Sequence, residues 1–127
     1  MRFGYTILYV RDVAASVDLY ERAFGQRRRF VHESGDYAEL ETGDTTLSFA
    51  SHELAESNLP DAFRTPDGSA TAFEVCFVTE DVAAAYDRAV REGAEPVTPP
   101  QTQPWGQDLA YVRDADGNLV ELASPAR

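Results

Sequence analysis

The chain has 127 residues, of which 43% are hydrophobic, and this fits one ordinary domain or two small modules that share a core. Its 22 acidic and 11 basic residues give a net charge of −11, which argues against nucleic acids and anionic membrane surfaces as partners. No apolar run approaches the length of a membrane span, and no basic segment followed by an apolar stretch opens the chain. We expect a soluble cytoplasmic protein whose negative charge either favours cationic ligands or only confers solubility.

The first half of the chain predicts one strand, one helix and three further strands. Residues 3–10 are rich in β-branched and aromatic side chains, as in a strand. Asp12 stands where a helix N-cap is expected, the apolar residues of 13–24 follow helical spacing, and Gly25 ends the helix. Alternating patterns predict three short strands, at 27–32, 36–42 and 45–51.

Residues 52–70 form the least regular stretch of the chain. Leu54 and Ala55 allow one helical turn, and the prolines and glycine that follow break any continuation. We expect this stretch to be a linker between two modules or a lid beside a site.

The pattern of the first half then restarts. Residues 71–79 predict a strand, Asp81 is placed to cap a helix over residues 82–92, and Gly93 ends it. Cys76 is the only cysteine and lies in this apolar strand, so we expect a buried packing thiol rather than a nucleophile. The remaining elements are strands at 94–98, 108–113 and 118–124, a Pro-rich loop at 99–107 and a turn at 114–118.

The two halves are similar in sequence as well as in pattern. YTILYVRDVAASVDLYERAFG, from Tyr5, aligns with EVCFVTEDVAAAYDRAVREG, from Glu74, and ETGDTTLSFAS aligns with RDADGNLVELAS. The second alignment sets Ser48 opposite Glu121. These matches predict a duplicated βαβββ unit, with one module at about 1–52, a linker at about 53–70 and a second module at about 71–127.

The same segments carry a resemblance to a known family. With DxDGNxxEL in DLAYVRDADGNLVELASP as the most specific pattern, the chain resembles the vicinal oxygen chelate superfamily over nearly its whole length. That superfamily includes glyoxalase I, extradiol dioxygenases, fosfomycin-resistance enzymes and bleomycin-resistance proteins. The resemblance implies an α+β fold in which each βαβββ module forms a curved mixed sheet and two sheets pair into a cup that holds the ligand. By analogy it also implies a homodimer.

The resemblance further implies where metal ligands would lie. Metal-dependent relatives carry a ligand on the first and last strand of each unit, commonly two His and two Glu. The matching positions here are Tyr5, Ser48, Glu74 and Glu121. Both imidazoles are therefore missing, and zinc-like ions generally require imidazole or thiolate ligands. We expect no metal and no other cofactor, although two carboxylates and a phenol could in principle hold a hard cation.

A cup without metal still has walls that could hold a ligand. Strand alternation predicts that the four matched residues point inward, and Tyr9 shares the parity of Tyr5. The expected ligand-binding residues are Tyr5, Tyr9, Ser48, Glu74, Trp105, Tyr111 and Glu121.

Several of these residues have a structural alternative. Glu74 could pair with an arginine of the 27–29 run, Glu121 could pair within its sheet, and Trp105 could pack over core surface. His52 shares the parity of Ser48 and could reach the rim of the cup, or it could be an ordinary exposed loop histidine.

Three functional hypotheses follow from these features. The first is a non-catalytic protein of the bleomycin-resistance type that sequesters an aromatic, cationic antibiotic or natural product. The second is an enzyme, either a glyoxalase-like lyase or isomerase or dioxygenase-type enzyme with unusual metal ligands, or a metal-free acid–base catalyst that uses Glu74 and Glu121. The third is an interaction module whose cup is filled by its own side chains.

Overall fold

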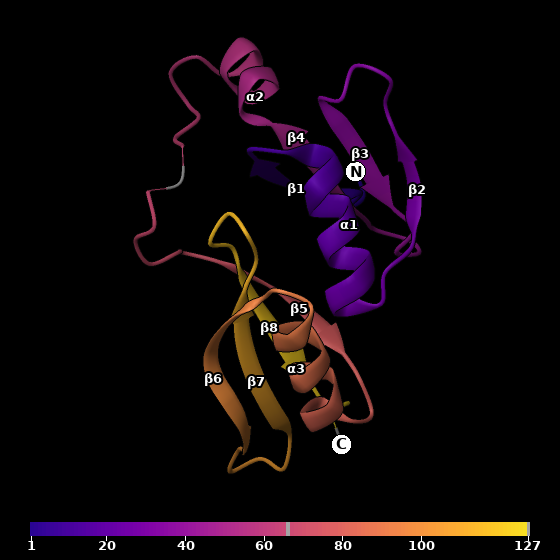
Figure 1. Ribbon diagram of the computed structural model, residues 1–127, viewed down its shortest axis with the longest axis vertical. Coiled ribbons are helices and arrows are strands. Elements are labelled where there is room, and N and C mark those ends of the chain that lie inside the picture. The colour runs from indigo at the N-terminus through magenta and orange to yellow at the C-terminus, as the bar shows by residue number, and fades with distance from the viewer. Residues whose placement is uncertain (66, 127) are drawn as a thin grey trace. The chain divides into compact units, whose positions relative to one another are not determined.

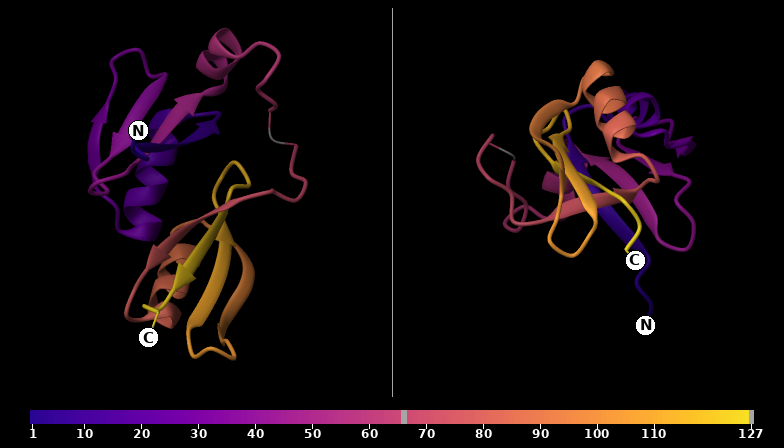
Figure 2. Two further views of the ribbon diagram at one scale, coloured as in Figure 1. Left: turned by 180° about the vertical axis from the view of Figure 1, so that it is seen from behind. Right: turned by 90° about the horizontal axis from the view of Figure 1, so that it is seen from below.

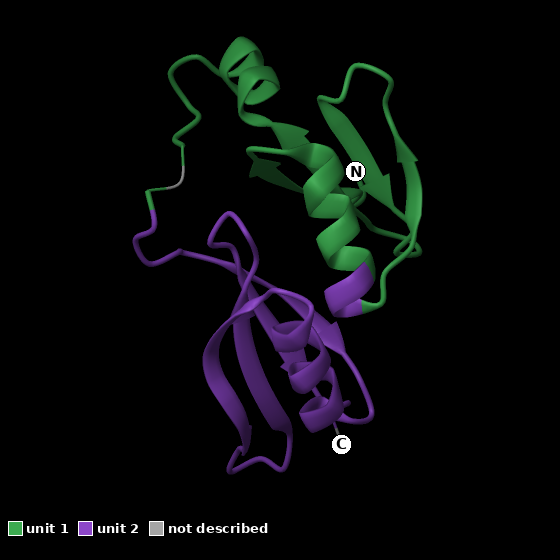
Figure 3. Cartoon of the chain, viewed as in Figure 1, with its two compact units in different colours: residues 1–21, 25–67 green, residues 22–24, 68–127 purple. Residues whose placement is uncertain are grey.

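The computed structural model describes residues 1–65 and 67–126, and it divides into two compact units. Unit 1 comprises Met1–Glu21 and Gly25–Asp67, and unit 2 comprises Arg22–Phe24 and Gly68–Arg127 (Figure 3). Each unit contains one four-stranded sheet, and the element order is βαβββ in both, as the sequence predicts (Figure 1). No helix among the described residues is long and apolar enough to span a membrane.

The sheet of unit 1 has the strand order β1-β4-β3-β2. The edge strand β1 runs parallel to β4, and the other neighbours are antiparallel. The strands fall within the predicted ranges, at Tyr5–Val10 (β1), Arg28–Val31 (β2), Tyr37–Leu40 (β3) and Thr46–Ser51 (β4).

Helix α1 (Val13–Phe24) has the predicted bounds, and local hydrogen bonds explain both ends. The Asp12 carboxylate accepts from the backbone N–H of Ala15 at 3.0 Å, which satisfies a donor that has no partner inside the helix. Gly25 adopts the left-handed conformation, with φ of 65°, that closes the other end at little steric cost. The helix packs on one face of the sheet, where the ring centroids of Tyr20 and Phe49 are 4.8 Å apart (Figure 1).

A second helix, α2 (His52–Asn58), occupies the stretch for which the sequence predicts at most one helical turn. The prediction was too short because Ser51, the last residue of β4, also serves as a helix N-cap. Its hydroxyl accepts from the backbone N–H of Leu54 at 3.0 Å, and Glu53 adds a negative charge in the first turn. The helix packs against β4 and β1.

The sheet of unit 2 has the strand order β5-β8-β7-β6, which is the same arrangement as in unit 1. Helix α3 (Val82–Arg91) packs on β6, β7 and β8, and Asp81 caps it through the N–H of Ala84 at 3.0 Å. The strands are Glu74–Val78 (β5), Glu95–Thr102 (β6), Asp108–Arg113 (β7) and Leu119–Ala123 (β8), and Figure 2 gives two further views of both sheets.

Strand β6 is longer than predicted, because it continues through Pro99 and Pro100, which the sequence assigned to a loop. An edge strand tolerates proline, since the missing N–H need not serve a second neighbour. The pairing with β7 nevertheless shifts twice, between Pro96 and Thr98 and between Thr98 and Gln101.

The two sheets repeat each other in register. Ser48 on β4 lies across from Ile7 on β1, and Glu121 on β8 lies across from Cys76 on β5. Counting back two residues from Ile7 and Cys76 reaches Tyr5 and Glu74. The residues that the duplication aligns therefore hold equivalent sites in two separate sheets.

Candidate functional site

In unit 2, three of the predicted ligand-binding residues gather on one sheet face. Strand alternation sets Glu74 and Cys76 on the same face of β5, and Cys76 lies across from Glu121 on β8. Tyr111 on β7 lies directly across from Glu121 and donates its hydroxyl to that carboxylate, with 3.4 Å between the oxygens. We call Glu74, Tyr111 and Glu121 the carboxylate cluster.

The two carboxyl groups of the cluster affect each other strongly. A hydrogen bond with Glu121 is the main reason that the pKa of Glu74 rises from 4.5 to about 7, and partial burial adds to the rise. Burial, together with the charges of Glu121 and Glu74, also raises the pKa of the Tyr111 phenol. Near neutral pH, the cluster therefore holds one proton between two groups that would each be ionised if they stood alone.

No described cation of unit 2 forms an ion pair with the carboxylate cluster. Arg28 pairs with Asp18 and Glu21, and Arg29 pairs with Glu39 and Glu41, while Glu74 forms no ion pair with any described residue. The predicted alternative of a salt bridge between Glu74 and the arginine run at 27–29 stays a prediction, because the run lies in unit 1 and Glu74 in unit 2.

Arg113 is the basic residue nearest in register to the cluster, since it lies across from Leu119, the neighbour of Glu74. Its guanidinium instead donates to the backbone oxygen of Gly117 at 2.8 Å. Among the described residues of unit 2, the cluster thus has no counter-ion.

The expectation of a buried Cys76 thiol was wrong. Cys76 is exposed on the same face as Glu121, because the apolar side chains that precede and follow it in β5 point the other way. Its surroundings still desolvate the sulfur, and this effect, together with the Glu121 carboxylate, raises the thiol pKa to about 12. The thiol is therefore a weak nucleophile at neutral pH. Its parity with Glu74 could have indicated this position from the sequence.

Trp105 lies at the tip of the β6–β7 hairpin, with 64% of its surface exposed. Its indole N–H donates to the Gln107 side chain at 2.9 Å, and Gln107 in turn donates to the backbone oxygen of Ser124 at 2.8 Å. The hairpin thus holds an exposed ring by a short chain of hydrogen bonds. The predicted alternative, in which this ring packs over core surface, is not observed within unit 2.

In unit 1, Tyr5, Tyr9 and Ser48 lie on one face of the sheet, opposite the face that α1 covers. Tyr5 is 52% exposed, whereas Ser48 is fully buried and its hydroxyl meets no described group in hydrogen-bond geometry. The carboxyl groups of Glu74 and Glu121 in unit 2 thus have no counterpart at the equivalent positions, Tyr5 and Ser48, in unit 1. That both sets line one hollow stays a prediction from the sequence.

The sequence did not identify a second polar group on this face, formed by Arg29, Tyr37 and Glu39. A β-bulge in β2 directs Arg29 toward Glu39 on β3, at 2.8 Å, and toward Glu41, at 2.9 Å. The Tyr37 hydroxyl donates to Glu39 at 2.8 Å. Burial raises the pKa of the Tyr37 phenol, and the nearby Ser48 hydroxyl partly opposes this. Glu39 is thus neutralised by Arg29 within unit 1, unlike the carboxylate cluster in unit 2.

His52 is the first residue of α2 and is only half-buried, so it is not an ordinary exposed loop histidine. Its ring lies 5.5 Å from that of Phe63, and its Nε2 atom is buried without a hydrogen-bond partner among the described residues.

Comparison with known proteins assigns this arrangement to a family. The model described as the Glyoxalase/Bleomycin resistance protein/Dioxygenase superfamily matches residues 2–122. The chain belongs to this superfamily. A curated relative, the uncharacterized protein YraH of Bacillus subtilis (strain 168), is 27% identical over 117 residues, which is 91% of each chain.

Solved structures in the same superfamily have the same fold. A glyoxalase-related enzyme from Fulvimarina pelagi superposes with a TM-score of 0.85 at 20% identity, covering 98% of this chain and 88% of its own. A family enzyme from Burkholderia phytofirmans PsJN gives 0.84 at 22% identity, with 95% and 96% covered. At these identities the likeness establishes the fold alone.

The donor set of this superfamily member does not fit a zinc-like ion within either unit. Unit 2 offers two carboxylates, a phenol and a thiol of raised pKa, and it offers no imidazole. Unit 1 offers Tyr5 and Ser48 at the equivalent positions. Among the described residues, no three His, Cys, Asp or Glu side chains gather closely enough to hold a metal ion.

Proposed function

We propose that the protein binds a small organic cation at the carboxylate cluster, as a non-catalytic binding protein that sequesters an aromatic antibiotic or natural product. The observation that carries the proposal is the pairing of Glu74 with Glu121 on a sheet face where no described arginine of unit 2 neutralises them. The hydrogen bond with Glu121, followed by burial and the Glu121 charge, raises the pKa of Glu74, and the two carboxylates repel each other when both are ionised.

A cationic ligand would remove this repulsion. Its positive charge would stabilise both carboxylates, so that binding releases the proton held near neutral pH. The phenol of Tyr111 provides an aromatic surface and a hydroxyl beside the charges, which suits a ligand with a ring next to an amine. The affinity for a cationic ligand should therefore rise between about pH 6 and pH 8, because at higher pH less free energy is needed to remove the proton from Glu74.

Titration of the purified protein with basic glycopeptide and intercalating drugs tests the proposal. Trp105 is the only tryptophan, and calorimetry provides a readout that does not depend on its distance from the ligand. Glu121→Gln should weaken binding of a cationic ligand about tenfold or more, whereas Glu33→Gln, at an exposed site in unit 1, should not. Absence of saturable binding across the panel would sink the proposal, as would equal affinities for wild type and Glu121→Gln.

An acid–base enzyme is the second candidate function, and the pKa of Glu74 at about 7 favours it. A general acid or base works best when its pKa lies near the operating pH. In a metal-free enzyme, Glu74→Gln would abolish turnover without weakening substrate binding. A glyoxalase-like or dioxygenase-type enzyme with unusual metal ligands would retain a stoichiometric metal after purification without chelator, and would lose it in Glu121→Ala.

We also propose that the chain forms a homodimer. The edge strands β1 and β5 and the residues just before them carry exposed apolar side chains, among them Phe3, Tyr5, Phe73 and Val78. A second copy of the chain would remove these side chains from water. Light scattering on the wild type should give twice the chain mass, and Val78→Lys should give the monomer. A wild-type protein that is monomeric up to about 100 μM would contradict this.

A further inference from the structure

We propose that unit 1 contains a second binding site, an apolar cavity of about 160 Å³ between the β1-β4-β3 face and helix α2, which takes a neutral single ring. All of its lining residues belong to unit 1. The carboxylate cluster belongs to unit 2, so this inference goes beyond the proposed cation-binding function.

A small residue between two tyrosines creates the cavity. Ala50 on β4 lies across from Tyr9 on β1 and from Tyr37 on β3, so the three side chains form one row across the sheet. Adjacent strands lie about 4.8 Å apart, which sets the two tyrosines roughly 10 Å from each other at the backbone. The methyl group of Ala50, 4% exposed, leaves the space between them open.

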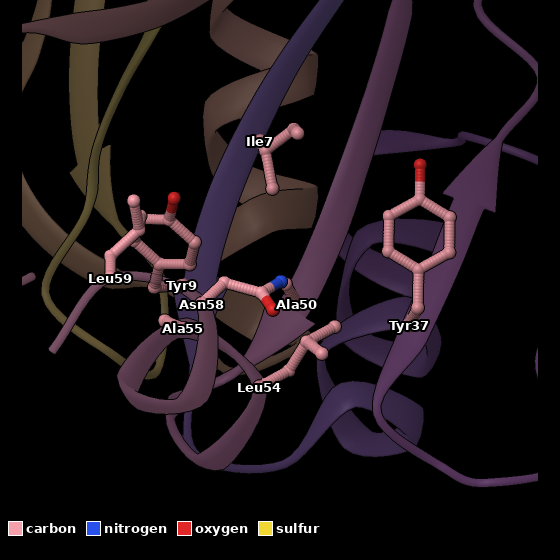
Figure 4. Close-up of a pocket in the computed structure, with 8 residues that line it drawn as sticks. All are labelled: Ile7, Tyr9, Tyr37, Ala50, Leu54, Ala55, Asn58 and Leu59. Carbon is pink, nitrogen blue, oxygen red and sulfur yellow. The ribbon is translucent and has the colours of Figure 1, made fainter.

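Helix α2 and the residue that follows it form one side of the cavity. Leu54, Ala55 and Leu59 line it together with Ile7 of β1, and the Ser51 cap fixes the start of the helix directly after β4. Figure 4 shows Ile7 and Leu54 pointing toward the side on which the Tyr37 ring stands. The lining residues thus come from β1, β3, β4, α2 and the residue after α2, all in unit 1.

Phe63 packs against Tyr9, one of the lining residues of the cavity. Its ring meets Tyr9 edge-to-face with 5.1 Å between centroids, and it also lies 5.5 Å from the His52 ring. Such a contact holds an aromatic side chain in one orientation. Tyr37 is held by its hydrogen bond to Glu39, so both tyrosine walls are set before any ligand enters.

The size and chemistry of the cavity define its ligand class. A cavity of about 150 Å³ lined by apolar side chains accommodates benzene, whereas sites for drug-sized ligands begin at roughly 300 Å³. No charged side chain lines this cavity, and its lining residues with polar groups are Tyr9, Tyr37 and Asn58. Because Tyr37 donates its proton to Glu39, its oxygen remains an acceptor for a ligand hydroxyl. A neutral ring with one hydroxyl meets these conditions.

Phenol is the probe that tests this site, followed by two-dimensional amide NMR on the full chain. We expect saturable shifts at the amides of Ala55 and Leu59. Ala50→Val fills the row between the tyrosines and should weaken phenol binding at least tenfold, while Ala14→Val, at an exposed position of α1, should leave it unchanged. Absence of saturable shifts in the wild type overturns the proposal, and so does unchanged affinity in a folded Ala50→Val.

A second variant keeps the test decisive if Ala50→Val does not fold. Leu54→Ala enlarges the cavity, so the ratio of indole affinity to phenol affinity should rise at least threefold over wild type. An unchanged ratio overturns the proposal. Glu121→Gln should leave phenol binding intact, and this separates failure of the cavity from failure of the cation site.

Discussion

Tyr111 on β7 directs its hydroxyl at the carboxylate of Glu121 on β8, the residue directly across from it. The phenol therefore lies beside the carboxyl pair as a hydrogen-bond donor, next to Glu74, whose pKa the contact with Glu121 and partial burial raise to about 7.

Replacing Tyr111 with Phe should raise the pKa of Glu74 further, because the Tyr111 hydroxyl no longer competes with protonated Glu74 as a donor to Glu121. Carboxyl-carbon NMR of Glu74 between about pH 5 and pH 8 measures this shift. Tyr86→Phe on α3 is the matched control and should leave the Glu74 titration unchanged. Identical titrations of wild type and Tyr111→Phe would contradict the role assigned to this hydroxyl.

The raised pKa of Glu74 should make the fold less stable as pH rises. The folded state binds this proton more tightly than the unfolded chain, whose Glu titrates near 4.5, so stability is lost as pH rises from about 4.5 through 7. The loss should be on the order of 1 kcal/mol, because exposure of Glu74 to solvent reduces the full effect.

Glutamine at position 121 provides the comparison for this effect. Glu121→Gln removes the repulsion, so urea unfolding of this variant should lack the loss, while Glu33→Gln should keep it. The difference between wild type and Glu121→Gln isolates the pair from other groups, such as Glu21 and Glu41, whose lowered pKa values act in the opposite direction. A constant difference between pH 5 and pH 8 would rule out the coupling.

Most of the fold could be predicted because its signals are local. Asp12 and Gly25 bound α1, and Asp81 and Gly93 bound α3, through contacts with residues only a few positions away. The duplication added the long-range register, since matching Ser48 with Glu121 requires no knowledge of side-chain contacts. The family assignment confirmed the α+β arrangement of two modules.

The errors in prediction arose where a residue has two roles or where pairing decides its environment. Ser51 ends a strand and also caps α2, and alternation along β4 indicates only the first role. Cys76 is apolar by type but shares its parity with Glu74, and the apolar neighbours on β5 hid that relationship. The cavity beside Ala50 depends on two neighbouring strands at once, which no local pattern reveals.

Arg29 should contribute more to stability than Arg28, although both are paired with two acidic residues. Arg29 neutralises Glu39, which is only 8% exposed, whereas the partners of Arg28 are far more exposed to solvent. Arg29→Met leaves a largely buried carboxylate unpaired and should lower the Tm by several degrees, while Arg28→Met should change it little.

Glu39→Gln supplies the rescue in this series. It removes the buried charge while leaving an oxygen to accept from Tyr37, so it should restore much of the stability of Arg29→Met. Thermal unfolding of the wild type, Arg29→Met, Glu39→Gln and the double variant measures the coupling between the two residues. Equal losses in Arg29→Met and Arg28→Met would show that burial of Glu39 is unimportant.

Asp114 should be the residue that fixes the β7–β8 turn. It is 5% exposed, and its carboxylate accepts from the backbone N–H of Asp116 at 2.9 Å, from that of Asn118 at 2.8 Å, and from the Asn118 side chain at 2.9 Å. Asp114→Ala leaves these donors unsatisfied in a partly buried turn and should reduce the free energy of unfolding by about 2 kcal/mol.

Two further variants separate the hydrogen bonds of Asp114 from its charge. Asp114→Asn keeps an acceptor oxygen for the backbone donors, so its cost should be less than half that of Asp114→Ala. Asp44→Ala, at an exposed position of the β3–β4 turn in unit 1, should lie within about 0.5 kcal/mol of wild type. Because the turn sets the register that brings Glu121 across from Tyr111, Asp114→Ala should also weaken binding at the carboxylate cluster. Urea unfolding and cation titration of the same samples measure both effects, and a destabilised Asp114→Ala with unchanged cation affinity would separate the turn from the site.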